Sequence, residues 1–240
     1  MNFAQRSSQP ELMDTEIVTA DDFAACLADL ATVNRLTLAK QPTLAWLAAA
    51  TRDFPAGGTV SILDVGFGQG DMLRAIWKMC HRRGLKAELV GVDLNPLSAV
   101  AAKQATPPQM QIDYRTGDVF ALPVSPRFDF IVCSLLTHHL SDDDLVPFLR
   151  LLEDRSVCGW FINDLHRHPV PYHTFRVLAA VAGWHRFVRH DGPVSIARSF
   201  RRGDWEALLA QAGVSASIRW HMPFRYCVSS TKLDPSSGAR

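Results

Sequence analysis

The sequence has almost no net charge and no long apolar run. Its 25 lysines and arginines nearly balance 24 aspartates and glutamates, which gives a formal net charge of +1. This balance does not indicate a nucleic-acid partner or a membrane surface. No stretch of about 18 consecutive residues is apolar, and the first residues are polar, so we expect neither a membrane span nor a signal peptide.

Cysteines are few and lack paired spacing. The five are Cys26, Cys80, Cys133, Cys158 and Cys227, with no C-x-x-C pair among them. Their odd number and apolar neighbours predict buried free thiols in a reducing compartment, and hence a cytoplasmic location. With 240 residues, 48% of them apolar, the chain is long enough for one sizeable soluble domain.

A glycine-rich stretch follows the first apolar run. Residues 60–65 read as a short strand, Gly66, Gly68 and Gly70 follow at alternate positions, and a helix pattern begins at Met72. Glycine is needed where backbone takes a positive φ or approaches a ligand closely. A glycine loop between a strand and a helix in an open α/β sheet predicts a nucleotide-cofactor site.

The glycine spacing selects among cofactors. The dinucleotide fingerprint is G-x-G-x-x-G, whereas here the spacing is G-x-G-x-G and Asp71 takes the last glycine position of the dinucleotide pattern. An acid there would repel a pyrophosphate, which disfavours the alternative of a nicotinamide-dependent oxidoreductase. S-adenosylmethionine carries a sulfonium and an ammonium group, so nearby acids favour it.

The stretch Asp64–Gly70 resembles the first motif of class I S-adenosylmethionine-dependent methyltransferases. The resemblance is to the small-molecule type, similar to the superfamily of ubiquinone and menaquinone biosynthesis. It implies an α/β fold with a Rossmann-like, seven-stranded, mostly parallel sheet, an antiparallel last strand and helices on both faces. It also implies a methyltransferase domain over residues 58–231, an N-terminal helical cap over 1–57 and a disordered tail over 232–240.

Two further acids lie at or just after the ends of predicted strands. Asp93 ends the strand 88–93, where the acid of such folds accepts hydrogen bonds from ribose hydroxyls. By the resemblance, Asp118 accepts from the adenine amino group and Val119 frames the ring. The alternative readings are a helix-capping residue for Asp93 and a turn residue for Asp118. The cofactor-binding set that the resemblance implies is Asp64, Gly66, Gly68, Gly70, Asp93, Leu94, Asp118, Val119 and Ser134.

The strand at 128–135 leads into a pair of histidines. Leu136–Leu140 resembles the fourth family motif in its His-His-Leu form. A phenol with a pKa of about 10 would benefit from a histidine base with a pKa of about 6.5. We name His139 as the first candidate for a catalytic base and His166 as the second; the alternative for each is a hydrogen-bonded wall residue.

The segment after the fifth strand (158–165) is rich in histidine and aromatic residues. By the resemblance, residues 166–198 are a substrate lid with a short helix at 174–182; the alternative is a helical insert that only packs on the domain. His166 and His168 are poorly spaced as helical ligands and no carboxylate cluster joins them, so no metal site is expected. A helix at 200–212 and two strands at 215–221 and 224–230 complete the domain.

The function that this resemblance implies is methyl transfer from S-adenosyl-L-methionine to a small phenolic or polyketide-like acceptor, with O-methylation favoured over C-methylation. The N-P-P-Y-type motif of base N-methyltransferases is absent after the fourth strand, where 134–137 reads Ser-Leu-Leu-Thr. An aromatic small molecule is therefore the expected partner, and a homodimer is left open. The main alternative is a non-catalytic S-adenosylmethionine-binding protein.

Overall fold

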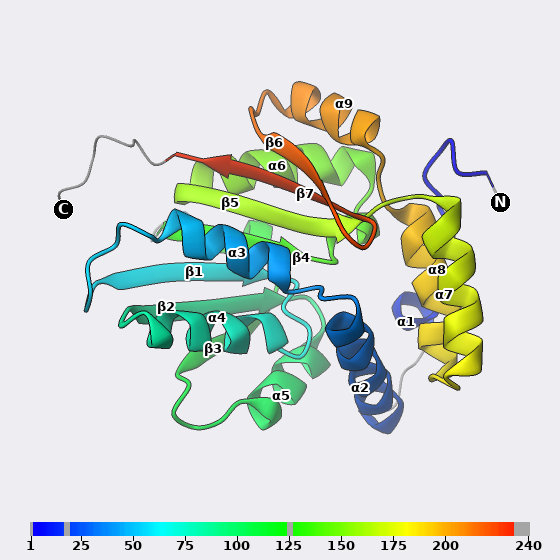
Figure 1. Cartoon of the computed structure of the whole chain (residues 1–240), viewed down its shortest axis with the longest axis horizontal. Helices are drawn as coiled ribbons and strands as arrows, with labels where there is room; N and C mark the ends of the chain where they lie inside the picture. Colours follow the sequence, from blue (N-terminus) through cyan, green and yellow to red (C-terminus); the bar gives the residue numbers. More distant parts are fainter. Residues whose placement is uncertain (1, 17–19, 124–126, 233–240) are drawn as a thin grey trace.

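The computed structural model describes residues 2–16, 20–123 and 127–232, and it is built on one seven-stranded sheet (Figure 1). The strand order is β3-β2-β1-β4-β5-β7-β6. The five parallel strands are β1 (Thr59–Val65), β2 (Lys86–Asp93), β3 (Ile112–Thr116), β4 (Phe128–Ser134) and β5 (Ser156–Leu165). This order brings the carboxyl ends of β1, β2 and β4 next to one another.

The sheet ends in an antiparallel pair. The last strand, β7 (Arg225–Thr231), runs antiparallel to β5, and β6 (Ser217–His221) runs antiparallel to β7. The two strands are joined through Met222 and Pro223, as the sequence predicts. The expected fold class is therefore confirmed, with strand bounds that differ by one or two residues.

Helices cover both faces of the sheet, because strands such as β4 are apolar on both sides. On one face, α3 (Gln41–Ala50), α4 (Asp71–Arg82) and α5 (Pro96–Ala105) form a core with the strands. On the other face, α6 (Asp142–Arg155) and α9 (Arg202–Ala212) do the same. Asn95 and Ser141 cap α5 and α6 through their side chains.

The remaining helices gather at the carboxyl ends of the parallel strands (Figure 1). They are α1 (Leu12–Thr15), α2 (Ala20–Leu36), α7 (Pro169–Val181) and α8 (Arg186–Arg198). The predicted cap of the first long helix, Thr19, lies outside the described residues. Among the described residues, no helix is both long and apolar enough to cross a membrane.

The helices of the 166–198 segment differ from the sequence prediction in two ways. Helix α7 begins at Pro169 rather than at 174, because a proline suits the first turn and the His168 ring accepts from the Val170 N–H at 3.2 Å. Helix α8 was not predicted, since Gly192 and Pro193 signal a break. Burial of its apolar side chains overrides that local signal, and a β-carbon on Gly192 would come within 2.1 Å of the Phe175 ring, so the glycine permits close packing of α7 on α8.

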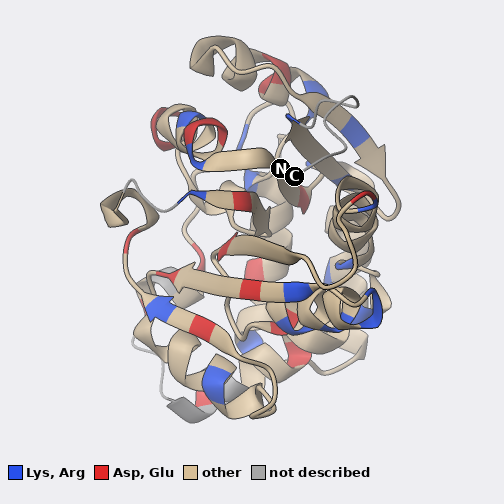
Figure 2. Cartoon of the chain, turned by 90° about the vertical axis from the view of Figure 1, so that its left-hand side faces the viewer, with Lys and Arg blue, Asp and Glu red and all other residues tan. Residues whose placement is uncertain are grey.

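Charged residues of both signs are spread over the molecule. On the side drawn in Figure 2, acidic and basic residues of the described chain alternate over strands and helices. The five cysteines are free, and four of them are buried. Burial raises the pKa of the Cys26 thiol and the Cys227 thiol to about 12, which keeps both protonated and unreactive at neutral pH.

Candidate active site

The three glycines after β1 form a loop whose backbone requires them. Gly66, Gly68 and Gly70 have φ angles of +72°, +53° and +72°, a region that other residues rarely adopt, and Gly70 is the N-cap of α4. A β-carbon on Gly70 would lie 2.4 Å from the Tyr114 hydroxyl, so this glycine serves packing. A β-carbon on Gly68 would meet nothing within 4 Å. The loop therefore has open space beside Gly68, where a ligand can approach the backbone.

Asp64 provides an unsatisfied acceptor beside this loop. Its side chain is buried within β1, and its Oδ2 has no hydrogen-bond partner in the described part of the chain. Burial raises the pKa of the Asp64 carboxyl well above its usual value, and the negative charges of Asp71 and Asp93 add to the increase. A buried carboxyl of this kind fits a ligand that brings a donor or a positive charge.

Asp93 joins the end of β2 to the glycine loop. Its Oδ2 accepts from the Gly68 N–H and its Oδ1 from the Asn95 N–H, both at 2.9 Å. A carboxylate offers about four acceptor positions, so positions on Asp93 are left for the two hydroxyls of a ribose. The helix-capping alternative is wrong in one respect, because the Asn95 side chain rather than Asp93 caps α5.

The other predicted cofactor residues lie at the same edge of the sheet. Asp93 is paired with Thr116 across β2 and β3, and the next residue, Gly117, donates its N–H to the Asp93 carbonyl at 2.9 Å. Asp118 is the next residue in the chain, so it lies at the same edge of the sheet as Asp93. Its Oδ1 accepts from the Phe120 N–H, and Val119 beside it is buried. Leu94 is 73% exposed, which leaves its side chain available to cover a flat ring.

Residues of α2 and of the segment between α2 and α3 contact this edge. Lys40 pairs with Asp71 at 3.0 Å, and the Gln69 side chain donates to the Leu27 carbonyl at 3.2 Å. At the end of β4, the hydroxyl of Ser134 lies 3.5 Å from that of Thr43 in α3. The predicted residue Ser134 therefore lies where β4, the strand next to β1, meets helix α3.

Beyond β4, a short 3-10 helix η2 (Thr137–His139) is fixed by a buried acid. Asp164 of β5 is fully buried and accepts from the Thr137 hydroxyl, from the His138 N–H at 3.1 Å and from His138 Nδ1 at 2.7 Å. Burial alone would raise the pKa of the Asp164 carboxyl, but the His138 charge and these hydrogen bonds lower it to about 2. The sequence analysis missed this residue, although an acid inside an apolar strand is a usable signal.

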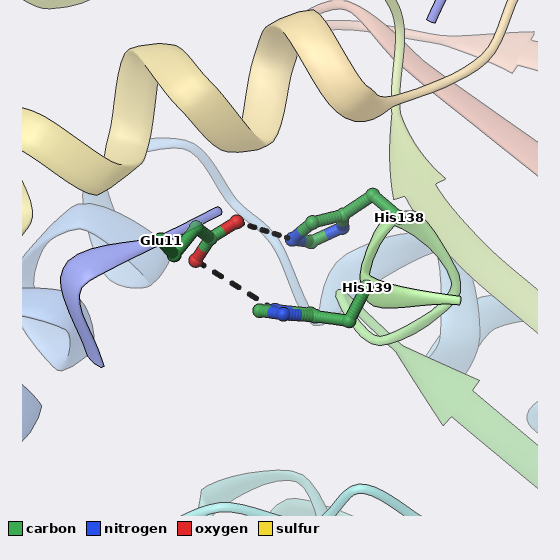
Figure 3. Close-up of side chains that lie close together, drawn as sticks. All are labelled: Glu11, His138 and His139. Carbon is green, nitrogen blue, oxygen red and sulfur yellow. Dashed lines mark ion pairs between the residues drawn. The ribbon is translucent and has the colours of Figure 1, made fainter. Parts of the chain in front are cut away.

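The two histidines of η2 face a third residue that the sequence did not indicate. His138 Nε2 lies 3.8 Å from Glu11 Oε1, and His139 Nε2 lies 3.8 Å from Glu11 Oε2 (Figure 3). Glu11 and His138 are buried, whereas the His139 side chain is 30% exposed. His139 is therefore the member of this group that an acceptor can reach.

His166, the second predicted base, has a different set of neighbours. Its Nδ1 accepts from Trp220 Nε1 at 3.2 Å, and its ring packs against His168, Phe224 and Tyr226. Burial lowers the pKa of His166 to about 4, and the nearby charges of His168, Arg201 and Arg167 contribute. The structure does not bring His166 into the group formed by Glu11, His138 and His139.

Comparison with known proteins gives a family match over part of the chain. Residues 62–156, from β1 to the first residue of β5, match the family model of a methyltransferase domain. No curated protein matches the chain. Among solved structures, an S-adenosylmethionine-dependent methyltransferase from Aquifex aeolicus is similar at 17% identity, with 90% of this chain and 100% of that chain covered and a TM-score of 0.61.

Two further similar structures were determined with S-adenosylhomocysteine bound. The plantazolicin methyltransferase BpumL is 15% identical over 89% of this chain and 96% of that chain, with a TM-score of 0.64. Magnesium protoporphyrin IX methyltransferase from Synechocystis PCC 6803 is 15% identical over 82% of this chain and 83% of that chain, with a TM-score of 0.55. At these identities the likeness establishes the shared fold.

Proposed function

We propose that the chain is a class I S-adenosylmethionine-dependent methyltransferase that methylates an oxygen of a small phenolic or polyketide-like acceptor. The fold and the family match of residues 62–156 support the methyltransferase activity. The observation that carries the proposal is the edge of the sheet at which the glycine loop meets Asp64, Asp93 and Asp118. The histidines of η2 follow β4, the strand next to β1.

The residues at this edge fit the cofactor. S-adenosylmethionine supplies a methyl group on a positively charged sulfur. Asp93 accepts from the ribose hydroxyls, Asp118 from the adenine amino group, and Leu94 and Val119 enclose the adenine ring. The backbone at Gly66 and Gly68 takes the close approach of the rest of the ligand. The unsatisfied carboxyl of Asp64 favours a ligand with ammonium and sulfonium groups over a pyrophosphate.

The acceptor binds on the other side of the loop, under the N-terminal segment and the lid helices α7 and α8. A dry, enclosed position favours loss of the positive charge at sulfur, and alignment of the acceptor oxygen with the methyl group supplies much of the acceleration. His139 is the histidine that an acceptor hydroxyl can reach, and it takes the hydroxyl proton. His166 is a weaker base, because its pKa is about 4.

The acceptor class is proposed from the composition of the 166–198 segment and of the whole chain. The 166–198 segment carries aromatic side chains, among them Tyr172, Phe175 and Trp184, and the chain has a net charge of only +1. Both features suit an apolar aromatic acceptor better than a polyanion. The free, buried cysteines support a cytoplasmic location.

Transfer of a labelled methyl group from S-adenosylmethionine to a panel of phenols tests this function. We expect O-methylated product with the unaltered chain and a loss of about 100-fold in kcat with His139→Asn, the size expected for removal of an acid–base group. Affinity for S-adenosylhomocysteine should change by no more than about twofold in that variant.

The matched control is His81→Asn, which replaces an exposed histidine of α4 and should leave kcat unchanged. Products methylated only at carbon would contradict the proposed O-methylation. Full activity of His139→Asn would remove His139 from the chemistry while leaving the methyltransferase assignment in place.

A further inference from the structure

Glu11, His138 and His139 bring three metal-binding side chains together from two distant parts of the chain. Their ligand atoms, one carboxylate oxygen and two ring nitrogens, all lie within 4.8 Å of one another. Both rings point from η2 toward the single carboxylate of Glu11 (Figure 3). Each imidazole faces its own carboxylate oxygen at 3.8 Å, which is too long for a hydrogen bond.

We propose that Glu11, His138 and His139 bind a divalent transition-metal ion, of which Zn²⁺ is the best match. Two imidazoles and one carboxylate, with a remaining position for a solvent or substrate oxygen, are a ligand set of zinc enzymes. Bonds of about 2.0–2.2 Å in tetrahedral geometry place ligand atoms about 3.4 Å apart. The two separations of 3.8 Å exceed this value by a few tenths of an ångström, and ligand atoms that lie up to 4.8 Å apart have to approach by more than an ångström, through rotation of the side chains.

The hydrogen bonds around the cluster prepare it for an ion. His138 donates Nδ1–H to the buried Asp164 at 2.7 Å, so Nε2 is the ring nitrogen that faces Glu11. A carboxylate behind the outer nitrogen of a metal-bound histidine is the usual arrangement around such ions.

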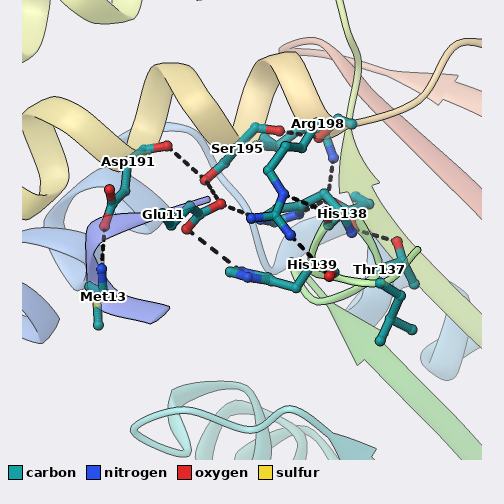
Figure 4. A network of polar contacts seen from close by, with 12 residues as sticks. Glu11, Met13, Thr137, His138, His139, Asp191, Ser195 and Arg198 are labelled. Carbon is teal, nitrogen blue, oxygen red and sulfur yellow. Dashed lines mark hydrogen bonds and ion pairs between the residues drawn. The ribbon is translucent and has the colours of Figure 1, made fainter. Parts of the chain in front are cut away.

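Residues of α8 hold Glu11 in its position beside the two histidines (Figure 4). Ser195 donates its hydroxyl to Glu11 Oε1 at 2.8 Å. The buried Asp191 accepts from the N–H groups of Leu12 and Met13 at 2.8 and 3.1 Å, which fixes the turn that follows Glu11.

The opposite side of η2 is also anchored. Arg198 donates to the carbonyls of His138 and His139 at 3.1 and 3.0 Å. Arg198 therefore fixes the backbone that carries both histidines, and Asp164 fixes the ring of His138.

The chemical role of the ion rests on the proposed function. The sequence analysis expected no metal site, because it considered only His166 and His168. In the ion-bound protein, His139 is a ligand rather than a free base, and the ion lowers the pKa of an acceptor oxygen that occupies its open position. Because His139 is partly exposed, that position faces the side from which an acceptor enters.

The test is titration of the full-length, chelator-treated protein with Zn²⁺ by calorimetry, and with Co²⁺ by visible absorption, with no methyl donor or acceptor present. We expect one ion per chain and the absorption of cobalt bound by nitrogen and oxygen. Glu11→Gln and His139→Asn should each weaken Zn²⁺ binding at least 100-fold, and Asp164→Asn by 10- to 100-fold. The control His81→Asn should bind as the unaltered chain does.

Thermal unfolding and titration with S-adenosylhomocysteine, run on the same samples, show that each variant is folded. The proposal is overturned if the unaltered chain takes up no Zn²⁺, if folded Glu11→Gln binds it unchanged, or if the Co²⁺ spectrum shows thiolate ligands. Absence of ion binding with intact S-adenosylhomocysteine binding removes the metal site alone. Ion binding without S-adenosylhomocysteine binding removes the proposed methyl transfer alone.

Discussion

Replacing Asp93 by alanine is expected to raise the dissociation constant for S-adenosylhomocysteine at least 100-fold. Two hydrogen bonds from ribose hydroxyls to a carboxylate contribute about 1.5 kcal/mol each, or about 3 kcal/mol together. The variant also loses the bond from the Gly68 N–H to Asp93 Oδ2, so the glycine loop is less well fixed before the ligand arrives. Calorimetric titration of both proteins measures the difference.

Asp113→Ala is the matched control for this experiment. Asp113 is also an aspartate of the β2–β3 pair, but its side chain is exposed and pairs with Arg115. It should bind S-adenosylhomocysteine as the unaltered chain does. An Asp93→Ala protein that is folded and binds with undiminished affinity would show that the ribose is not held at the end of β2.

Replacing Gly68 by alanine is expected to reduce ligand affinity by more than its effect on the stability of the fold explains. An L-residue at φ +53° costs about 1 kcal/mol of folding free energy, and a methyl group here enters the space where the ligand approaches. We therefore expect a small fall in the free energy of unfolding and at least a tenfold loss of S-adenosylhomocysteine affinity. Denaturant unfolding and calorimetry measure the two effects.

Gly84→Ala is the matched control, because it introduces the same backbone strain at a position that the ligand does not approach. Gly84 follows α4 at the end opposite Gly70, has a φ of +69°, and its β-carbon would also meet nothing within 4 Å. It should lose similar stability and keep its affinity. Equal losses of affinity in the two variants would mean that Gly68 acts only through the stability of the fold.

The cofactor edge could be predicted from the sequence because its signals are local. The glycine spacing after β1, the acid that ends β2 and the triplet around Asp118 each lie within a few residues of a strand end. Parallel strands place their carboxyl ends at one edge, so the meeting of these residues follows once the strands are recognised. The positive φ angles of Gly66, Gly68 and Gly70 confirm that the loop needs glycine.

The histidine cluster could be predicted only in part. The His-His-Leu motif indicated His139, but no pattern in the sequence placed Glu11 beside it. That contact depends on Asp191 and Ser195 of α8. Local propensity does not predict this helix, because it contains Gly192 and Pro193. Contacts between segments far apart in the chain, made through an unpredicted helix, are not encoded in local patterns.

The central claim is that the edge formed by β1, β2 and β3 binds S-adenosylmethionine. Calorimetric titration of the unaltered protein with S-adenosylhomocysteine, with NADH as the comparison ligand, tests it most directly. The account predicts binding of one S-adenosylhomocysteine per chain in the micromolar range and no binding of NADH. Binding of NADH without S-adenosylhomocysteine would contradict the account and indicate an oxidoreductase site.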